Sequence, residues 1–159
     1  MSQEPCQSEP CQSAVRAWAR LVRAHQAAMS RVESALKAAG LPPLAWYEVL
    51  VELDRSGDRG VRPFALEEAL QLPQYGLSRL LARMEGAGLV LRGTCPGDGR
   101  GQIVAMTEAG REMLLRMGPV HSAAVQQAVG ARLSSEEAEG LAQLLGRLIA
   151  PPEGATAPR

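Results

Sequence analysis

The chain has 159 residues, of which 46% are hydrophobic and 21% are charged, and its formal net charge is zero. This length suits one domain with a buried core, and the composition excludes a disordered chain. No apolar run approaches the ~20 residues that a membrane-spanning helix needs, and the N-terminus lacks the apolar segment of a signal peptide. We therefore expect a cytoplasmic protein without membrane contact.

Charge is distributed unevenly along the chain. Residues 72–111 carry five arginines and three acidic residues, whereas residues 41–71 carry three arginines and six acidic residues. The later segment is net positive, which favours contact with a polyanion, although a net charge of zero argues against non-specific affinity for nucleic acid.

Residues 1–13 repeat Glu-Pro-Cys-Gln-Ser and show no periodicity, so we predict a disordered tail. Cys6 and Cys11 lie in this tail. They are either a redox or metal-binding pair, or part of a segment without function. The two histidines and three cysteines of the chain have no ligand-like spacing, so the sequence predicts neither a metal site nor a disulfide framework.

A long helix is predicted from Ala14 to Ala39, where Gly40 and Pro42 end it. Its seam recurs in steps of three and four: Val15, Trp18, Val22, His25, Met29, Val32 and Leu36. This narrow, coiled-coil-like seam needs a partner helix, which a second chain can supply.

Two shorter helices follow, over Pro43–Leu53 and Phe64–Leu70, with a loop at Ser56–Gly60 between them. Pro63 opens the second of these helices.

The next helix is opened by Pro73 and ended by Gly86 and Gly88. Its apolar residues fall at helical spacing: Leu77, Leu80, Leu81 and Met84. The opposite face carries Gln74, Tyr75, Ser78, Arg79 and Arg83. Such a polar, cationic face behind another short helix suits a DNA major groove, where Gln pairs with adenine, Arg with guanine and Ser with either. The first four residues are therefore candidate base readers; the alternative is an ordinary solvated face.

A β-hairpin is predicted from a strand beginning at Leu89–Leu91 and a second strand at Gln102–Met106. Four glycines between them predict a mobile turn longer than two residues. Arg100 near its tip is a candidate for the DNA minor groove. Two further arginines, Arg83 and Arg92, either contact phosphates or form internal salt bridges with Glu85 or Asp98.

The remaining chain predicts helices. Thr107 caps the first, which Gly118-Pro119 should kink or break before Gly130. Ser134 and Glu137 form a capping box for the last helix. Its apolar residues are Leu141, Leu144, Leu145, Leu148 and Ile149.

Helix, helix and hairpin together predict a winged helix-turn-helix in a mainly α protein with a small β wing (α+β). The sequence also resembles the MarR (multiple antibiotic resistance regulator) family from about Ala14 to Ile149. The residues carrying the likeness are Leu77-Ser78-Arg79-Leu80, Arg83-Met84-Glu85, Gly88-Leu89-Val90, Arg92, Asp98, Arg100 and Thr107-Glu108-Ala109-Gly110-Arg111.

The resemblance implies a single domain over residues 14–150, with residues 14–40 and 111–150 forming dimerisation helices, 41–110 a DNA-binding lobe, and 151–159 a tail. It implies that Asp98 orients the wing. It also implies an effector pocket for a small aromatic or phenolic compound, such as a planar apolar acid. The candidate lining residues are Trp18, His25, Met29, Trp46, Tyr47 and Met113.

We therefore expect a homodimeric regulator that represses transcription by binding a palindromic operator in double-stranded DNA. A small-molecule effector is expected to relieve this repression. The alternative is a ligand-binding or protein-interaction module with weak or lost DNA binding, which Gly76, Gly99 and the zero net charge favour. Cys95, close to two arginines, is a candidate redox sensor. No catalytic motif or cofactor-binding motif occurs, so we expect neither an enzyme nor a cofactor.

Overall fold

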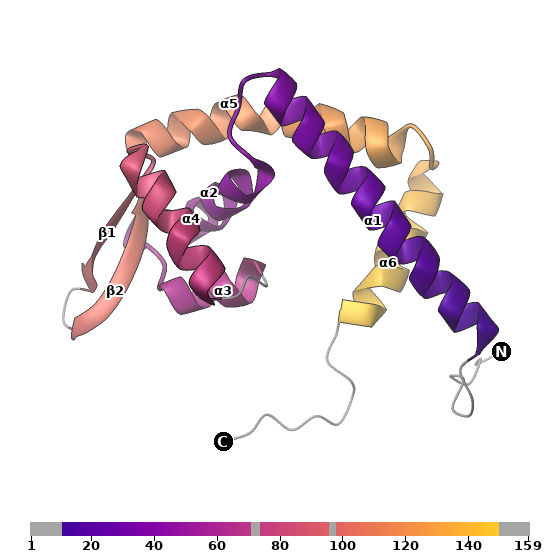
Figure 1. The fold of residues 1–159 in the computed structure, drawn as a ribbon, viewed down its shortest axis with the longest axis horizontal. Helices are drawn as coiled ribbons and strands as arrows, with labels where there is room; N and C mark the ends of the chain where they lie inside the picture. The colour runs from indigo at the N-terminus through magenta and orange to yellow at the C-terminus, as the bar shows by residue number, and fades with distance from the viewer. Residues whose placement is uncertain (1–10, 71–73, 96–97, 150–159) are drawn as a thin grey trace. The chain divides into compact units, whose positions relative to one another are not determined.

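The computed structural model describes residues 11–70, 74–95 and 98–149, without the side chains of residues 58, 74–75, 95 and 98–101. These residues form helices and one antiparallel hairpin, as predicted (Figure 1). The chain divides into two compact units. We name Val32–Ala123 the central unit, and Met1–Arg31 with Ala124–Arg159 the helical unit.

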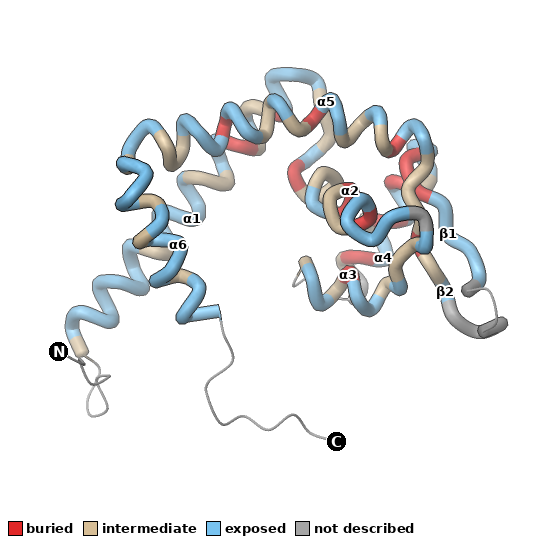
Figure 2. Tube along the Cα trace, turned by 180° about the vertical axis from the view of Figure 1, so that it is seen from behind, coloured by how far each residue is buried: buried red, intermediate tan, exposed pale blue. Residues whose placement is uncertain are grey.

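The central unit is built around α2 (Leu44–Ser56), α3 (Pro63–Leu70), α4 (Gln74–Gly86) and the hairpin. Its core residues are each at most 2% exposed: Val49, Leu50, Leu53, Leu66, Leu77, Leu81, Met84, Val90 and Val104. Figure 2 shows buried residues in α2, in α3 and at the base of the hairpin. The predicted apolar stripe of α4 therefore faces this core.

The C-terminus of α4 is closed by Gly88, which has a φ of +74°. The Gly88 amide donates to the carbonyl of Glu85 at 2.9 Å, and the Leu89 amide donates to the carbonyl of Met84 at 3.0 Å. This is a Schellman motif, in which glycine takes the left-handed conformation without a steric penalty. The helix thus stops where the sequence predicted, and the chain turns directly into the wing.

The wing consists of β1 (Val90–Cys95) and β2 (Asp98–Met106), paired from Val90↔Met106 to Cys95↔Asp98 with a bulge at Thr94/Cys95. The predicted long turn is wrong, because β2 begins four residues before Gln102. Gly93 pairs with Ile103, whereas Gly99 and Gly101 lie in the irregular stretch of β2 between its pairs with Cys95 and Thr94. Val61 also exchanges two 2.8 Å hydrogen bonds with Val104, which anchors the base of the wing.

Helix α5 (Glu108–Val125) begins where Thr107 was predicted to cap it. The Thr107 Oγ1 accepts a 3.0 Å hydrogen bond from the Gly110 amide and donates one of 2.7 Å to the carbonyl of Gly88. The predicted break at Pro119 is wrong, since the helix continues past it. Gly118 has no Cβ to clash with the proline ring, and Leu115, four residues before Pro119, is exposed.

The helical unit contains most of α1 (Gln12–Ala38), a π-helical turn (Gln126–Gly130) and α6 (Ser135–Ile149). The predicted capping box is present: the Ser134 amide donates to Glu137 Oε2 at 2.8 Å, and the Glu137 amide donates to Ser134 Oγ at 3.2 Å. Figure 2 shows α6 mostly exposed. None of the helices in the described part of the chain combines the length and the apolar character that a membrane span requires.

Candidate nucleic-acid interface

Helix α4 presents a polar surface opposite its buried stripe. Ser78, Arg79 and Arg83 are exposed, while Leu77 and Leu81 are buried. Arg79 has no ion-pair partner among the described residues. Gln74 and Tyr75 occupy the first turn of the same helix, but their side chains lie outside the described part of the chain. The fold therefore displays a cationic, hydrogen-bonding helix on a rigid apolar support.

Arg83 lies over the ring of Trp46 on α2, with its guanidinium carbon 5.8 Å from the ring centroid. A guanidinium over an aromatic face is attracted by the ring quadrupole. The indole ring also packs against the core of the central unit. Arg83 thus links α4 to α2 while its side chain stays exposed.

Arg92 at the start of the wing pairs with Glu85 near the end of α4. The Arg92 Nε donates to Glu85 Oε2 at 2.8 Å, and the Arg92 amide donates to Glu85 Oε1 at 3.3 Å. The hydrogen bonds from Arg92 hold the pKa of Glu85 below its ordinary value. Of the two internal partners considered for Arg92, the structure shows Glu85; the side chain of Asp98 lies outside the description.

Arg100, Asp98 and Cys95 all belong to the end of the hairpin farthest from its anchored base. The backbone pair Cys95↔Asp98 closes the ladder there. Their side chains lie outside the described part of the structure, so minor-groove contact, wing orientation and redox sensing stay predictions. Cys6 lies outside the described residues as well, whereas Cys11 lies immediately before α1 with its Sγ 2.7 Å from Ser13 Oγ.

The six residues predicted for an effector pocket divide between the two units. Trp18 and His25 line an apolar groove of about 730 Å³ in the helical unit, and Met29 is half-buried on the same helix. In the central unit, Trp46 and Met113 pack against the core. These two residues therefore serve packing in the central unit.

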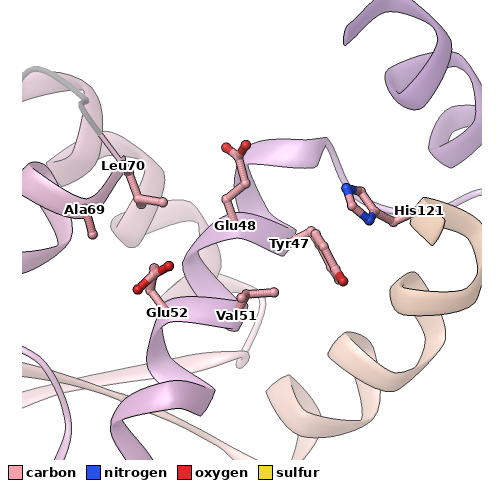
Figure 3. Close-up of a pocket in the computed structure, with 7 residues that line it drawn as sticks. All are labelled: Tyr47, Glu48, Val51, Glu52, Ala69, Leu70 and His121. Carbon is pink, nitrogen blue, oxygen red and sulfur yellow. The ribbon is translucent and has the colours of Figure 1, made fainter. Parts of the chain in front are cut away.

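Tyr47 lines a cavity of about 370 Å³ that is formed entirely within the central unit (Figure 3). We name it the Tyr47 cavity; its other lining residues are Glu48, Val51, Glu52, Ala69, Leu70 and His121. The rings of Tyr47 and His121 stack with their centroids 4.5 Å apart and their planes at 29°. No local pattern in the sequence pairs His121 with Tyr47.

Burial governs ionisation in the Tyr47 cavity. It lowers the pKa of His121, which favours the neutral imidazole. Burial, and then the charge of Glu33, raise the pKa of Glu48 above its ordinary value. The acidic lining could be predicted from the sequence, because Glu48 and Glu52 are four residues apart and therefore lie on one face of a helix.

The polar face of α4, the preceding α3 and the anchored hairpin define a winged helix-turn-helix protein. A family model described as MarR family matches residues 39–101. The Escherichia coli O111:H- protein named transcriptional regulator HosA is 36% identical over 109 residues, covering 69% of this chain and 80% of that protein. The chain belongs to the MarR family of transcriptional regulators, as its sequence indicated.

Two solved structures from Streptomyces coelicolor share the fold. The MarR-family regulator Sco3205, in complex with DNA, has 29% identity and a TM-score of 0.82, covering 94% of this chain and 96% of that chain. The MarR-family regulator AbsC has 28% identity and a TM-score of 0.79, covering 89% of this chain and 95% of that chain. These relatives are transcription regulators, and the chain shares their DNA-binding fold.

Proposed function

We infer that this protein is a homodimeric repressor that binds a palindromic operator in double-stranded DNA and is released by a small-molecule effector. The observation that carries this proposal is the exposed, cationic face of α4 on its rigid core. Sco3205, similar over nearly its whole length, is described in complex with DNA, which supports a DNA ligand for the same fold here.

In this proposal the first turns of α4 read base edges. Gln74, Tyr75, Ser78 and Arg79 occupy these turns, and side chains of these kinds hydrogen-bond to bases in the major groove. Arg100 enters the minor groove from the wing, with Asp98 orienting it. A basic side chain inserted there is favoured by the enhanced negative potential of a narrow groove.

Arg83 and Arg92 have a supporting part in this proposal. Arg83 is held over Trp46 and Arg92 is held by Glu85, so each links α4 to another element. Their remaining exposed N–H groups can still reach phosphates, which position a protein on DNA without reading its sequence. The internal partners and phosphate contact are therefore compatible roles.

Dimerisation is proposed from the apolar surface of the helical unit. Val15 and Trp18 are 56% and 67% exposed on α1, and Leu144, Leu148 and Ile149 are 58%, 71% and 73% exposed on α6. An apolar surface of this kind rarely stays open to water in a soluble monomer. A second copy covers it in a two-fold arrangement and brings two recognition helices to major grooves ~34 Å apart.

Effector relief follows if a ligand binds the DNA-free state more tightly than the DNA-bound state. The ratio of the two ligand affinities then sets the loss of DNA affinity. The candidate chamber is the Tyr47 cavity, with Trp18, His25 and Met29 in the helical unit as further candidate residues.

The test is fluorescence anisotropy with a labelled duplex from the region upstream of the coding sequence. We expect binding that weakens steeply with salt, with a log–log slope of about −0.9 per phosphate contact. Arg79→Ala should lower the affinity by about tenfold or more, the cost of about one bidentate base contact. The matched control is Arg147→Ala, which removes an exposed arginine from α6.

An affinity that is the same for Arg79→Ala and Arg147→Ala would contradict base reading by α4. If the unaltered protein showed no salt-sensitive binding to DNA, this result would instead support the alternative of a ligand-binding or protein-interaction module that has lost DNA binding.

A further inference from the structure

The Tyr47 cavity combines acidic groups with aromatic and apolar walls. We propose that it binds an organic cation with an aromatic body, such as an arylalkylamine. This inference rests on the proposed function, because it names the chemical class of the effector. It goes beyond that proposal by fixing the sign of the ligand's charge.

The charge of the cavity comes from α2. Glu48 has no cationic partner among the described residues, and the nearby carboxylate of Glu33 adds to its negative potential. Glu52 is the second acidic group, but Arg55 compensates it through a 2.6 Å ion pair. Among the residues that the structure describes, neither lysine nor arginine lines the cavity. An aromatic carboxylate would meet like charge there, whereas an ammonium group would find an uncompensated carboxylate.

The shape of the cavity suits the body of such a ligand. The stacked rings of Tyr47 and His121 form one wall, while Val51 and Leu70 supply apolar surface (Figure 3). Aromatic rings pack favourably against other rings, and the face of a tyrosine also attracts a cation. The volume of about 370 Å³ falls within the ~300–1,000 Å³ usual for small-molecule sites.

The same lining disfavours a metal ion. Within the described residues, no group of three or more His, Cys, Asp and Glu side chains could hold one. His121 already stacks on Tyr47, and burial favours its neutral form. An organic cation uses the ring wall, the apolar wall and the carboxylate together, which a bare ion cannot do.

The experiment uses two probes of nearly equal size and opposite charge, 2-phenylethylamine and 3-phenylpropanoate. Isothermal titration calorimetry on the full chain measures each affinity at pH 7.5. We expect the amine to bind at least tenfold more tightly than the acid. Glu48→Gln should weaken amine binding at least fivefold, while Glu112→Gln, an exposed residue of α5, should leave it unchanged.

Circular dichroism of Glu48→Gln guards against a folding artefact. Its melting temperature should match or exceed that of the unaltered protein, because burial disfavours the charged form of Glu48. Tighter binding of the acid, or equal amine affinity in folded Glu48→Gln, would overturn the proposal.

DNA anisotropy in the absence of either probe separates this inference from the proposed function. DNA binding without amine binding would refute the ligand class alone, whereas amine binding without DNA binding would refute the repressor and leave the ligand class standing.

Discussion

At the scale of single residues, the contact between Glu85 and Arg92 connects the recognition helix to the wing. Both side chains keep about a third of their surface exposed, so the pair is partly screened by water. The pair mainly fixes the geometry of this junction, because Glu85 accepts hydrogen bonds from both the guanidinium and the backbone amide of Arg92. One carboxylate therefore fixes where the first strand leaves α4.

The pair predicts a pH-dependent effect of Glu85→Gln. The folded protein lowers the pKa of Glu85 below its ordinary value of 4.5. The charged carboxylate thus adds stability above that value, and this contribution is lost as the pH falls through the lowered pKa. Glu85→Gln should melt at a lower temperature than the unaltered protein at pH 7, and the difference should shrink towards pH 3.

Thermal melts followed by circular dichroism at several pH values measure this difference. The control is Glu112→Gln, since Glu112 is exposed and makes no ion pair among the described residues. A Glu85→Gln difference that stays constant across the pH range would exclude the ion pair as its cause.

At the scale of elements, the start of α5 is fitted against the end of α4. Thr107 caps α5 and also donates to the Gly88 carbonyl, so one hydroxyl connects two elements. A Cβ placed on Gly110 would collide with the Leu89 carbonyl oxygen and lie 2.7 Å from the Cγ of Met106. The helix can therefore approach the wing this closely only with glycine at position 110.

Gly110→Ala should destabilise the protein by roughly 1–3 kcal/mol or more, as overpacking against backbone usually does. Gly146→Ala in α6 is the matched control, because a Cβ there meets nothing within 4 Å. Alanine favours the helix by up to ~1 kcal/mol, so the control should be neutral or stabilising. Urea unfolding compares the two variants, and equal stabilities would disprove the close fit.

Local signals in the sequence predicted the elements well. The spacing of Leu77, Leu81 and Met84 gave the buried face of α4, and Gly88, Thr107 and Ser134 gave helix boundaries that the structure confirms. These features depend on neighbours a few residues away, which one sequence displays. The bounds of the outer helices, predicted from the same periodicity, differ by only a few residues.

Features that depend on distant partners were harder to predict. The early start of β2 depends on the irregular register at Thr94/Cys95, which pairs Asp98 with Cys95 and which no local pattern in the sequence displays. The continuity of α5 through Pro119 depends on the glycine before the proline. Arg92 pairs with Glu85, which lies seven residues before it in the chain. Tyr47 stacks on His121, which belongs to a different helix.

At the scale of the whole molecule, the proposal depends on a second copy covering the helical unit. Leu141, Leu145 and Leu148 line one side of its groove and Trp18 the other. Burying apolar surface is the main favourable term in association. The exposed leucines of α6 therefore favour an assembly of more than one chain.

Leu148→Lys places a charge in this apolar surface and should weaken the dimer at least tenfold, because a buried ammonium lacks a partner there. Gln143→Lys adds the same charge on α6, beside Glu139 with which Gln143 is hydrogen-bonded, and should leave the assembly intact. Size-exclusion chromatography with light scattering gives the mass of each. Identical dimers from both variants would remove α6 from the interface.

The chain has two tryptophans, and their surroundings make them distinct optical reporters. Trp18 is 67% exposed in the helical unit, whereas Trp46 packs under Arg83 in the central unit. Indole emission shifts to shorter wavelength when water leaves the ring, so covering of Trp18 and displacement of Arg83 from Trp46 give separate spectral changes. Replacing one ring or the other with phenylalanine would give two unlabelled single-tryptophan proteins, one that reports subunit association through Trp18 and one that reports events at the recognition helix through Trp46.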